Sequence, residues 1–83
     1  MRHMALGLRE IWQHAFGRQL SAGPVVVNGR VLVAVGSTLY ALAAESGKTL
    51  WQRSVDATVT NLAADGDIVS VSTAYWSVYG FQL

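Results

Sequence analysis

The side chains of this sequence that could do chemistry form two small groups. His14 could combine with Ser54 or Asp56 in a hydrolytic triad, in which a base activates a nucleophile and an acid orients the base. No nucleophile elbow accompanies these residues. The segment 65–67, Asp-Gly-Asp, offers two carboxylates, whereas a calcium ion takes about six to eight oxygen ligands. We therefore expect a hairpin turn at 65–67, an ordinary strand histidine, no catalytic residue, no cofactor and no metal site.

The composition indicates a chain that associates. Hydrophobic residues make up 52% of the 83 residues and charged residues 13%, compared with about 25% charged residues in soluble domains. A chain of this length hides only about 60% of the surface that its unfolded form exposes. Because it has no cysteine for a disulfide, we expect it to be stabilised by other chains or by a larger body.

Charge and hydropathy argue against two classes of partner. Binding to nucleic acid needs clustered cations, but the six basic residues are scattered and the net charge is +1. Apolar runs such as Val31–Val35 are much shorter than the roughly 20 residues of a membrane-spanning helix. We expect neither a nucleic-acid partner nor a membrane span.

The chain matches itself at a spacing of 39 residues. Residues 11–13, Ile-Trp-Gln, recur as Leu-Trp-Gln at 50–52, and 38–42 match 77–81 at the same spacing. Between these pairs, 27–31 line up with 64–68 at a spacing of 37. A fixed period of this size is typical of repeat architectures. Loops of different length between the strands explain the change in spacing from 39 to 37.

Each unit is expected to consist of short strands separated by turns. Asn28-Gly29 and Asp65-Gly66 are signals for two-residue type I′ hairpins. The strands predicted for the first unit (23–55) are 23–27, 30–35, 38–43 and 49–55, and those for the second unit (59–83) are 59–64, 67–72 and 77–83. The second unit lacks a fourth strand, and an unpaired copy of that strand stands at 10–16.

Two interpretations of the N-terminal stretch stay open. The match to 50–55, which carries Ser and Val after a Ser-Gly-Lys turn, favours an outer strand over 10–16. An amphipathic helix over 4–16 is the alternative, because Met4, Leu8, Ile11, Trp12, Ala15 and Phe16 fall at helical spacing. The tail 1–9 is left outside the fold, since Met1–Met4 is typical of a cloning scar.

The burial pattern favours a propeller over a flat sheet. Val31–Val35 is apolar at every position, so both faces of that strand should be covered. Adjacent blades of a β-propeller supply such cover. We predict an all-β fold of two four-stranded antiparallel blades per chain, in which the second blade takes its outer strand from another molecule and the ring is completed by other copies or by a larger protein.

The stretch from Ala41 to Trp51 resembles a known motif. Its sequence, Ala-Leu-Ala-Ala-Glu-Ser-Gly-Lys-Thr-Leu-Trp, is similar to the tryptophan-docking motif of the quinoprotein (PQQ-like) β-propeller repeats, Ala-x-Asp/Asn-x-x-Thr-Gly-x-x-x-Trp. The likeness covers about residues 10–83. Ser46 replaces the usual Thr, and Ala43 stands where the family has Asp or Asn, so the side-chain hydrogen bond of that position cannot form.

The resemblance implies structural roles for the motif residues Ala41, Ser46, Gly47 and Trp51. It implies that the indole of Trp51 stacks on the neighbouring blade and that Gly47 allows a tight turn and a close approach. Trp12 should play the same part as Trp51. Family members include quinone-dependent alcohol dehydrogenases, an outer-membrane assembly scaffold and extracellular sensor domains of kinases. The dehydrogenase site usually has a vicinal disulfide and calcium ligands, so the absence of cysteine argues against an enzyme.

The loop 73–76 is a second candidate site. It replaces Gly36-Ser37 of the first unit and adds Tyr75 and Trp76, residue types that often anchor interfaces. One hypothesis is that this pair contacts a partner or lines the mouth of the ring. The alternative is that both side chains pack on an adjacent blade.

The function expected from these features is that of a non-catalytic structural or binding module. Segment 10–16 of one chain would supply the outer strand that the second blade of the next chain lacks, which is a head-to-tail contact. Two blades per chain predict a dimer, trimer or tetramer, because propellers have about four to eight blades, and eight-bladed family members favour the tetramer. The alternatives are a segment of a longer scaffold or sensor propeller and the remnant of a quinoprotein dehydrogenase.

Overall fold

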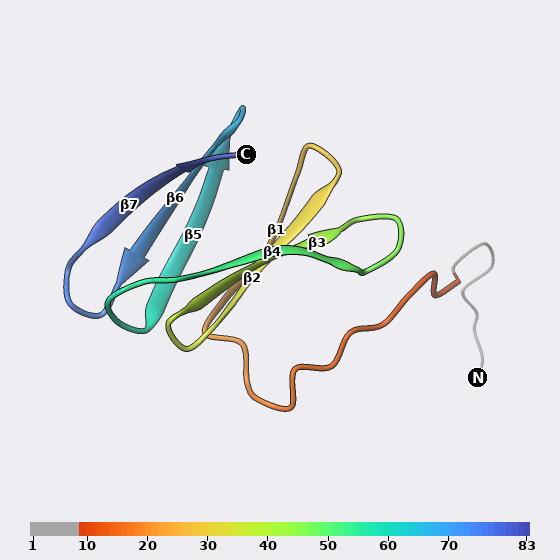
Figure 1. Cartoon of the computed structure of the whole chain (residues 1–83), viewed down its shortest axis with the longest axis horizontal. Coiled ribbons are helices and arrows are strands. Elements are labelled where there is room, and N and C mark those ends of the chain that lie inside the picture. The colour runs from red at the N-terminus through yellow and green to blue at the C-terminus, as the bar shows by residue number, and fades with distance from the viewer. Residues whose placement is uncertain (1–8) are drawn as a thin grey trace, which may run out of the picture.

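Two antiparallel β-sheets make up the computed structural model, which describes residues 9–83 (Figure 1). The strands are β1 (Ala22–Val27), β2 (Arg30–Val35), β3 (Thr38–Ala43), β4 (Thr49–Ser54), β5 (Val59–Asp65), β6 (Ile68–Thr73) and β7 (Val78–Gln82). The first sheet has the order β1-β2-β3-β4 and the second the order β5-β6-β7. This described part contains no helix and so none that could cross a membrane, and the all-β prediction is confirmed.

All seven strands predicted over 23–83 are present, each with bounds within about one residue of the prediction. Only the first sheet has four strands. The second ends at β7, so its fourth strand is missing, as the incomplete second repeat predicts.

The two hairpin predictions have different outcomes. Asn28 (φ 48°) and Gly29 (φ 73°) form the expected type I′ loop between β1 and β2. In the second sheet Asp65 pairs with Ile68, so the loop is Gly66-Asp67 and only Gly66 has a positive φ. The type I′ prediction for Asp65-Gly66 is therefore wrong by one residue.

A contact between the two hairpins accompanies this shift. The Asn28 side-chain amide donates hydrogen bonds to the Gly66 carbonyl (3.2 Å) and to the Asp67 carboxylate (2.6 Å). Since both acceptors lie in the Gly66-Asp67 loop, the contact with the first sheet favours the observed register over the one that local turn signals predict.

The strand predicted over 10–16 does not form within the described chain, and its pairing with another molecule stays a prediction. Residues 9–20 have no regular secondary structure and run as an extended segment across the first sheet (Figure 1). A β-strand needs a neighbouring backbone for its hydrogen bonds, and no strand of the described chain pairs with this segment. Residues 9–16 are not helical either, while the rest of the proposed helix and the Met1–Met4 scar lie outside the described residues.

The core lies between the two sheets. Its buried side chains come from both of them: Leu32, Ala34, Leu39, Ala41, Val59, Leu62, Val69 and Val71. On the opposite face of the first sheet, Val33 and Leu42 are 4% and 2% exposed, next to the N-terminal segment. Both faces of β2 are therefore covered, as its unbroken apolar sequence predicts.

Candidate functional site

The contact between Trp12 and Gly47 joins the N-terminal segment to the first sheet. The Trp12 indole N–H donates to the Ala44 carbonyl at 2.7 Å. Gly47 is buried with φ +74°, and a Cβ at this position would lie 2.5 Å from Trp12 Cδ2 and 2.9 Å from Cγ. Only glycine fits, because the backbone is left-handed and the ring lies where a side chain would be. The tryptophan docked on Gly47 is thus Trp12, a pairing that the motif itself does not specify.

The turn between β3 and β4 presents the acceptor for Trp12. The Gly47 N–H donates to the Ala43 carbonyl (2.8 Å) and the Ala43 N–H to the Lys48 carbonyl (2.8 Å). The Ser46 hydroxyl accepts from the Lys48 N–H at 3.3 Å. Backbone groups of Ala43 and the side chain of Ser46 therefore fold the turn without the carboxylate or amide that the motif usually carries, and the Ala44 carbonyl stays available to the indole.

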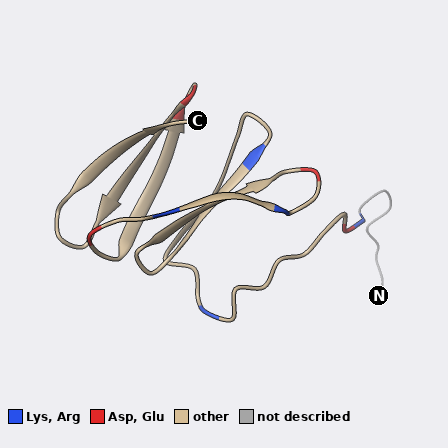
Figure 2. Ribbon diagram, viewed as in Figure 1, with Lys and Arg blue, Asp and Glu red and all other residues tan. Residues whose placement is uncertain are grey.

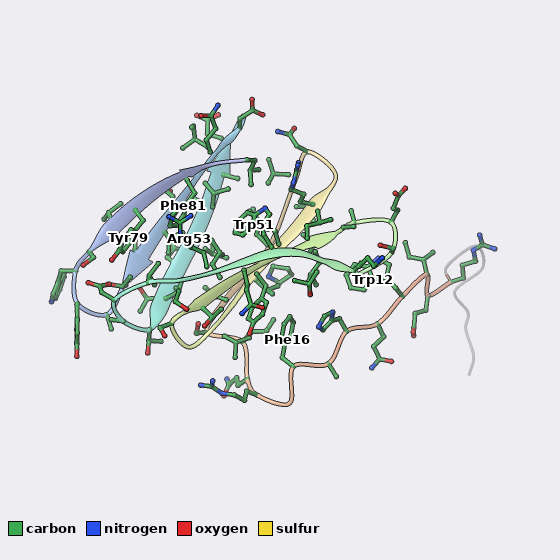
Figure 3. All side chains as sticks on the ribbon, in the orientation of Figure 1. Trp12, Phe16, Trp51, Arg53, Tyr79 and Phe81 are labelled. Atoms are coloured by element: carbon green, nitrogen blue, oxygen red, sulfur yellow. The ribbon has the colours of Figure 1, made fainter. Side chains whose placement is uncertain are left out.

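Alternate residues of the N-terminal segment follow Trp12 along the same face. His14 Nδ1 lies 3.1 Å from the Gly47 carbonyl oxygen, and its ring stacks on Phe16 at a centroid distance of 4.5 Å. Phe16 in turn meets Tyr40 of β3 at 4.8 Å. Figure 3 shows Trp12 and Phe16 on the same side of the first sheet. Sequence reasoning missed His14, Phe16 and Tyr40, although the i, i+2, i+4 spacing from Trp12 is the period of an extended chain.

Side chains of β4 face the second sheet, as side chains of the N-terminal segment face the first. Trp51 and Arg53 lie 39 residues after Trp12 and His14. The Arg53 guanidinium is 5.2 Å from the centroid of the Phe81 ring, and Figure 3 shows Arg53 over Phe81 with Trp51 farther along β4. The two tryptophans therefore occupy equivalent positions on consecutive sheets.

Trp51 differs from Trp12 in having no glycine turn against it. It borders a 350 Å³ groove with Arg53, Gly80, Phe81 and Gln82. No glycine of residues 9–83 has Trp51 among its nearest contacts. Ala41 pairs directly with Trp51 across the β3–β4 ladder and is fully buried. The four motif residues are thus gathered at β3 and β4, but Gly47 serves the tryptophan of the preceding repeat.

The edge of β7 is unpaired in the described chain. β7 pairs with β6 alone. The β2–β3 pairs of the first sheet correspond to the β6–β7 pairs of the second: Leu32↔Ala41 corresponds to Ser70↔Gly80, and Ala34↔Leu39 to Ser72↔Val78. The face of the first sheet that packs on the second is therefore apolar, while the equivalent outer face of the second carries two serines and a glycine.

The loop between β6 and β7 presents two aromatic side chains to solvent. Tyr75 is 72% exposed and Trp76 is 94% exposed. Trp76 has φ +67°, a backbone conformation that is unfavourable for a bulky side chain. Neither side chain packs into the core in the described chain, so packing on an adjacent sheet of the same chain does not account for them.

The residues considered for catalysis are engaged separately. His14 lies against Gly47 and Phe16, whereas Asp56 accepts a hydrogen bond from the Ser77 hydroxyl at 2.6 Å. That bond lowers the pKa of Asp56 below its ordinary value of 3.8. Residues 9–83 hold no group of three or more His, Cys, Asp or Glu side chains that could bind a metal. Figure 2 shows the Lys and Arg residues of this part of the chain spread over separate segments of the ribbon.

Comparison with known proteins relates nearly the whole chain to one family. The family model described as outer membrane protein assembly factor BamB, a PQQ-like repeat, matches residues 7–82. A search of curated proteins gave no match. The matched region contains both sheets and the Trp12 segment, so the N-terminal segment belongs to the repeat unit.

Proposed function

The chain belongs to the PQQ-like repeat family, and from that premise we propose that its two sheets are consecutive β-propeller blades that associate head to tail with other copies. The supporting observation is that one chain carries both a strand donor and a strand acceptor. Segment 10–16 lies where an outer strand would lie but pairs with no strand, and β7 lacks its outer neighbour.

The donor cannot reach the acceptor of its own chain. Trp12 and Phe16 lie on the Val33 and Leu42 face of the first sheet, while Leu32 and Ala41 of the opposite face pack on the second sheet. The first sheet therefore stands between the segment and β7 (Figure 1). On this proposal the pairing is between molecules, and Trp12 stays docked on Gly47 of its own chain while the segment pairs with β7 of another.

The joint between copies would be weaker than the joint within the chain. Leu32 and Ala34 are fully buried at the inner joint, and Ser70 and Ser72 take their places on the outer face. Burial of a leucine side chain contributes roughly 1.5–3 kcal/mol. Assembly should therefore be reversible and depend on concentration, with two, three or four copies completing a ring of four to eight blades.

The absolute mass in solution, measured by light scattering after size exclusion over a dilution series, tests this proposal. A species of two, three or four times 8.9 kDa that dissociates on dilution is the expected result, with the tetramer favoured because it gives eight blades. A chain that stays monomeric at every concentration would contradict self-association.

Two neighbouring proline substitutions test the strand contact itself. Strand N–H groups point alternately to the two sides, so either Gln13 or His14 directs its N–H toward β7. Proline removes that N–H. Of Gln13→Pro and His14→Pro, one should weaken assembly strongly and the other much less, and His14→Ala is the control for the loss of the His14 contacts with Gly47 and Phe16. Equal effects would contradict pairing at β7.

A second proposal is favoured by the uncovered Trp51: the chain is part of a longer propeller whose next repeat supplies the glycine turn and the outer strand. A peptide with the sequence of residues 43–55, which contains that turn and strand, should then bind the monomer and block the Trp51 groove. Quenching or a spectral shift of tryptophan fluorescence would report it, and the same peptide with Gly47→Val should not bind.

We propose no catalytic role. The family includes quinone-dependent enzymes, but His14 and Asp56, the titratable residues considered for catalysis, are held in separate structural contacts. A dehydrogenase remnant would instead develop quinone absorbance after incubation with calcium and the cofactor.

A further inference from the structure

The loop between β6 and β7 holds Trp76 outward at an energetic cost. A tryptophan at φ +67° is rare, because the Cβ atom crowds the backbone in the left-handed region. The same loop position would normally favour glycine. An exposed aromatic side chain that is kept in a strained position suggests a function.

Hydrogen bonds fix this loop. The Thr73 hydroxyl, which is buried, accepts from the N–H groups of Tyr75 (3.2 Å) and Ser77 (3.4 Å). The Trp76 N–H donates to the Thr73 carbonyl at 3.0 Å, and the Ala74 N–H donates to the Thr58 carbonyl at 2.9 Å. The two aromatic side chains are thus carried on a pre-organised backbone, which lowers the entropy cost of binding.

The first sheet shows what lies against such a loop. The connection from β4 to β5 crosses the Gly36-Ser37 loop: the Val55 N–H donates to the Ser37 carbonyl (2.9 Å) and the Val59 N–H to the Gly36 carbonyl (2.8 Å). Val59 is fully buried there. A connection from an outer strand to the next sheet therefore packs across the loop of the preceding sheet.

The chain contains a second connection of this kind that lacks such a loop. Residues 16–20 lie 39 positions before 55–59. This connection contacts the sheet that follows it. Arg18 Nη2 lies 3.1 Å from the Cβ position of Gly36, and the Ser21 hydroxyl donates to the Gly36 carbonyl at 3.3 Å. Leu20, the counterpart of the buried Val59, is 38% exposed. On its other side, residues 9–83 place no further sheet.

We propose that the β6–β7 loop is a latch between copies, in which Tyr75 and Trp76 of one molecule pack across residues 16–20 of the next and cover Leu20. This inference rests on the head-to-tail assembly proposed above. On the outer face of the second sheet, Ser70 and Ser72 stand where the first sheet has Leu32 and Ala34. The latch adds apolar contact at that joint. It also explains why the loop of the second sheet is longer and aromatic while that of the first is Gly36-Ser37.

Trp76→Gly is the informative substitution, because glycine accepts the left-handed backbone and so keeps the fold. Thermal unfolding under monomeric conditions should be unchanged or shifted upward, while the dissociation constant of the assembly, measured by dilution with light scattering, rises about 10-fold or more. Glu45→Gln is the control, since Glu45 is exposed in the turn between β3 and β4 and lies outside the latch. Its assembly should match that of the unsubstituted chain.

A double-mutant cycle with Leu20→Ser tests the pairing. Leu20→Ser should weaken assembly in the unsubstituted chain and have little further effect in Trp76→Gly. Assembly that is unaffected by Trp76→Gly but lost in one of the proline variants would overturn the latch and leave the strand contact standing. A chain that never assembles would overturn both. Loss of binding to a different protein, with self-assembly intact, would assign the aromatic pair to a foreign partner and overturn the latch.

Discussion

Replacing Gly47 by alanine should cost much more than replacing Gly29, although the two glycines have nearly the same backbone. Their φ angles are +74° and +73°, but a Cβ on Gly29 meets nothing within 4 Å, whereas one on Gly47 meets the indole of Trp12. Alanine in the left-handed region costs about 1–2 kcal/mol at either site. The difference between the two variants therefore isolates the docking of Trp12.

The size of that difference follows from what the indole would lose. If alanine displaces the ring, the hydrogen bond from Trp12 to Ala44 is lost, at about 1 kcal/mol, together with the burial of one indole face, at roughly 1–2 kcal/mol. Because the N-terminal segment has no strand partner, the ring can leave, so the extra cost cannot exceed the free energy of docking. We expect Gly47→Ala to lower the free energy of unfolding by about 2–3 kcal/mol more than Gly29→Ala.

Urea unfolding followed by circular dichroism at one fixed protein concentration measures both variants. The same pair in a Trp12→Ala background completes a double-mutant cycle, in which the costs of the two alanine substitutions should become equal. Equal costs in the presence of Trp12 would refute the docking argument. A difference that persists without Trp12 would place its cause in the turn between β3 and β4.

Three further substitutions probe the outer face, the loop carboxylate and the core. Ser70→Leu restores the leucine found at the equivalent Leu32 and should tighten assembly at least 10-fold by light scattering; unchanged assembly would show that this face does not meet another copy. Because the Ser77 hydrogen bond lowers the pKa of Asp56, its stabilisation is complete above the unfolded value near 3.8 and is lost as the pH falls through the lower folded value. Thermal melts from about pH 2 to pH 7 should therefore lose less stability at acid pH in Asp56→Asn than in the unsubstituted chain, and parallel curves would contradict this. Leu32→Ala should lower the free energy of unfolding by about 2–5 kcal/mol through the cavity it leaves, and a urea midpoint close to the unsubstituted value would place Leu32 outside the core.

The strands could be predicted from the sequence because their signals are local. Alternating and continuous apolar runs fixed the seven strands over 22–82, and Asn28-Gly29 fixed one hairpin. Asp65-Gly66-Asp67 contains two overlapping turn signals, and the apolar pattern allows either loop, since both registers keep Leu62 and Val69 on one face. The hydrogen bonds from Asn28 favour the Gly66-Asp67 loop. Local sequence cannot predict a contact between residues 38 positions apart.

The sequence identifies the residues of the docking site, but it does not identify the tryptophan that docks on Gly47. The motif marks Gly47 as a place of close approach, yet it does not say which tryptophan approaches. Trp51 stands only four residues after Gly47 and faces the second sheet, so the ring that reaches the glycine comes from the repeat before it. The sequence also favours a strand over 10–16, but a strand forms only beside a partner, and the described chain offers this segment none.

On the proposed assembly, the same repeat geometry would produce two joints of different strength. Within the chain, leucine and alanine of β2 and β3 meet the valines of the second sheet and hold the two sheets together as one body. At the outer face the geometry is kept and the apolar content is reduced, so a copy that docks there gains less from burial. On the proposed assembly the chain would remain folded as a unit while its ring opens and closes with concentration, and the strained Trp76 would decide whether a second copy is held once its strand has paired.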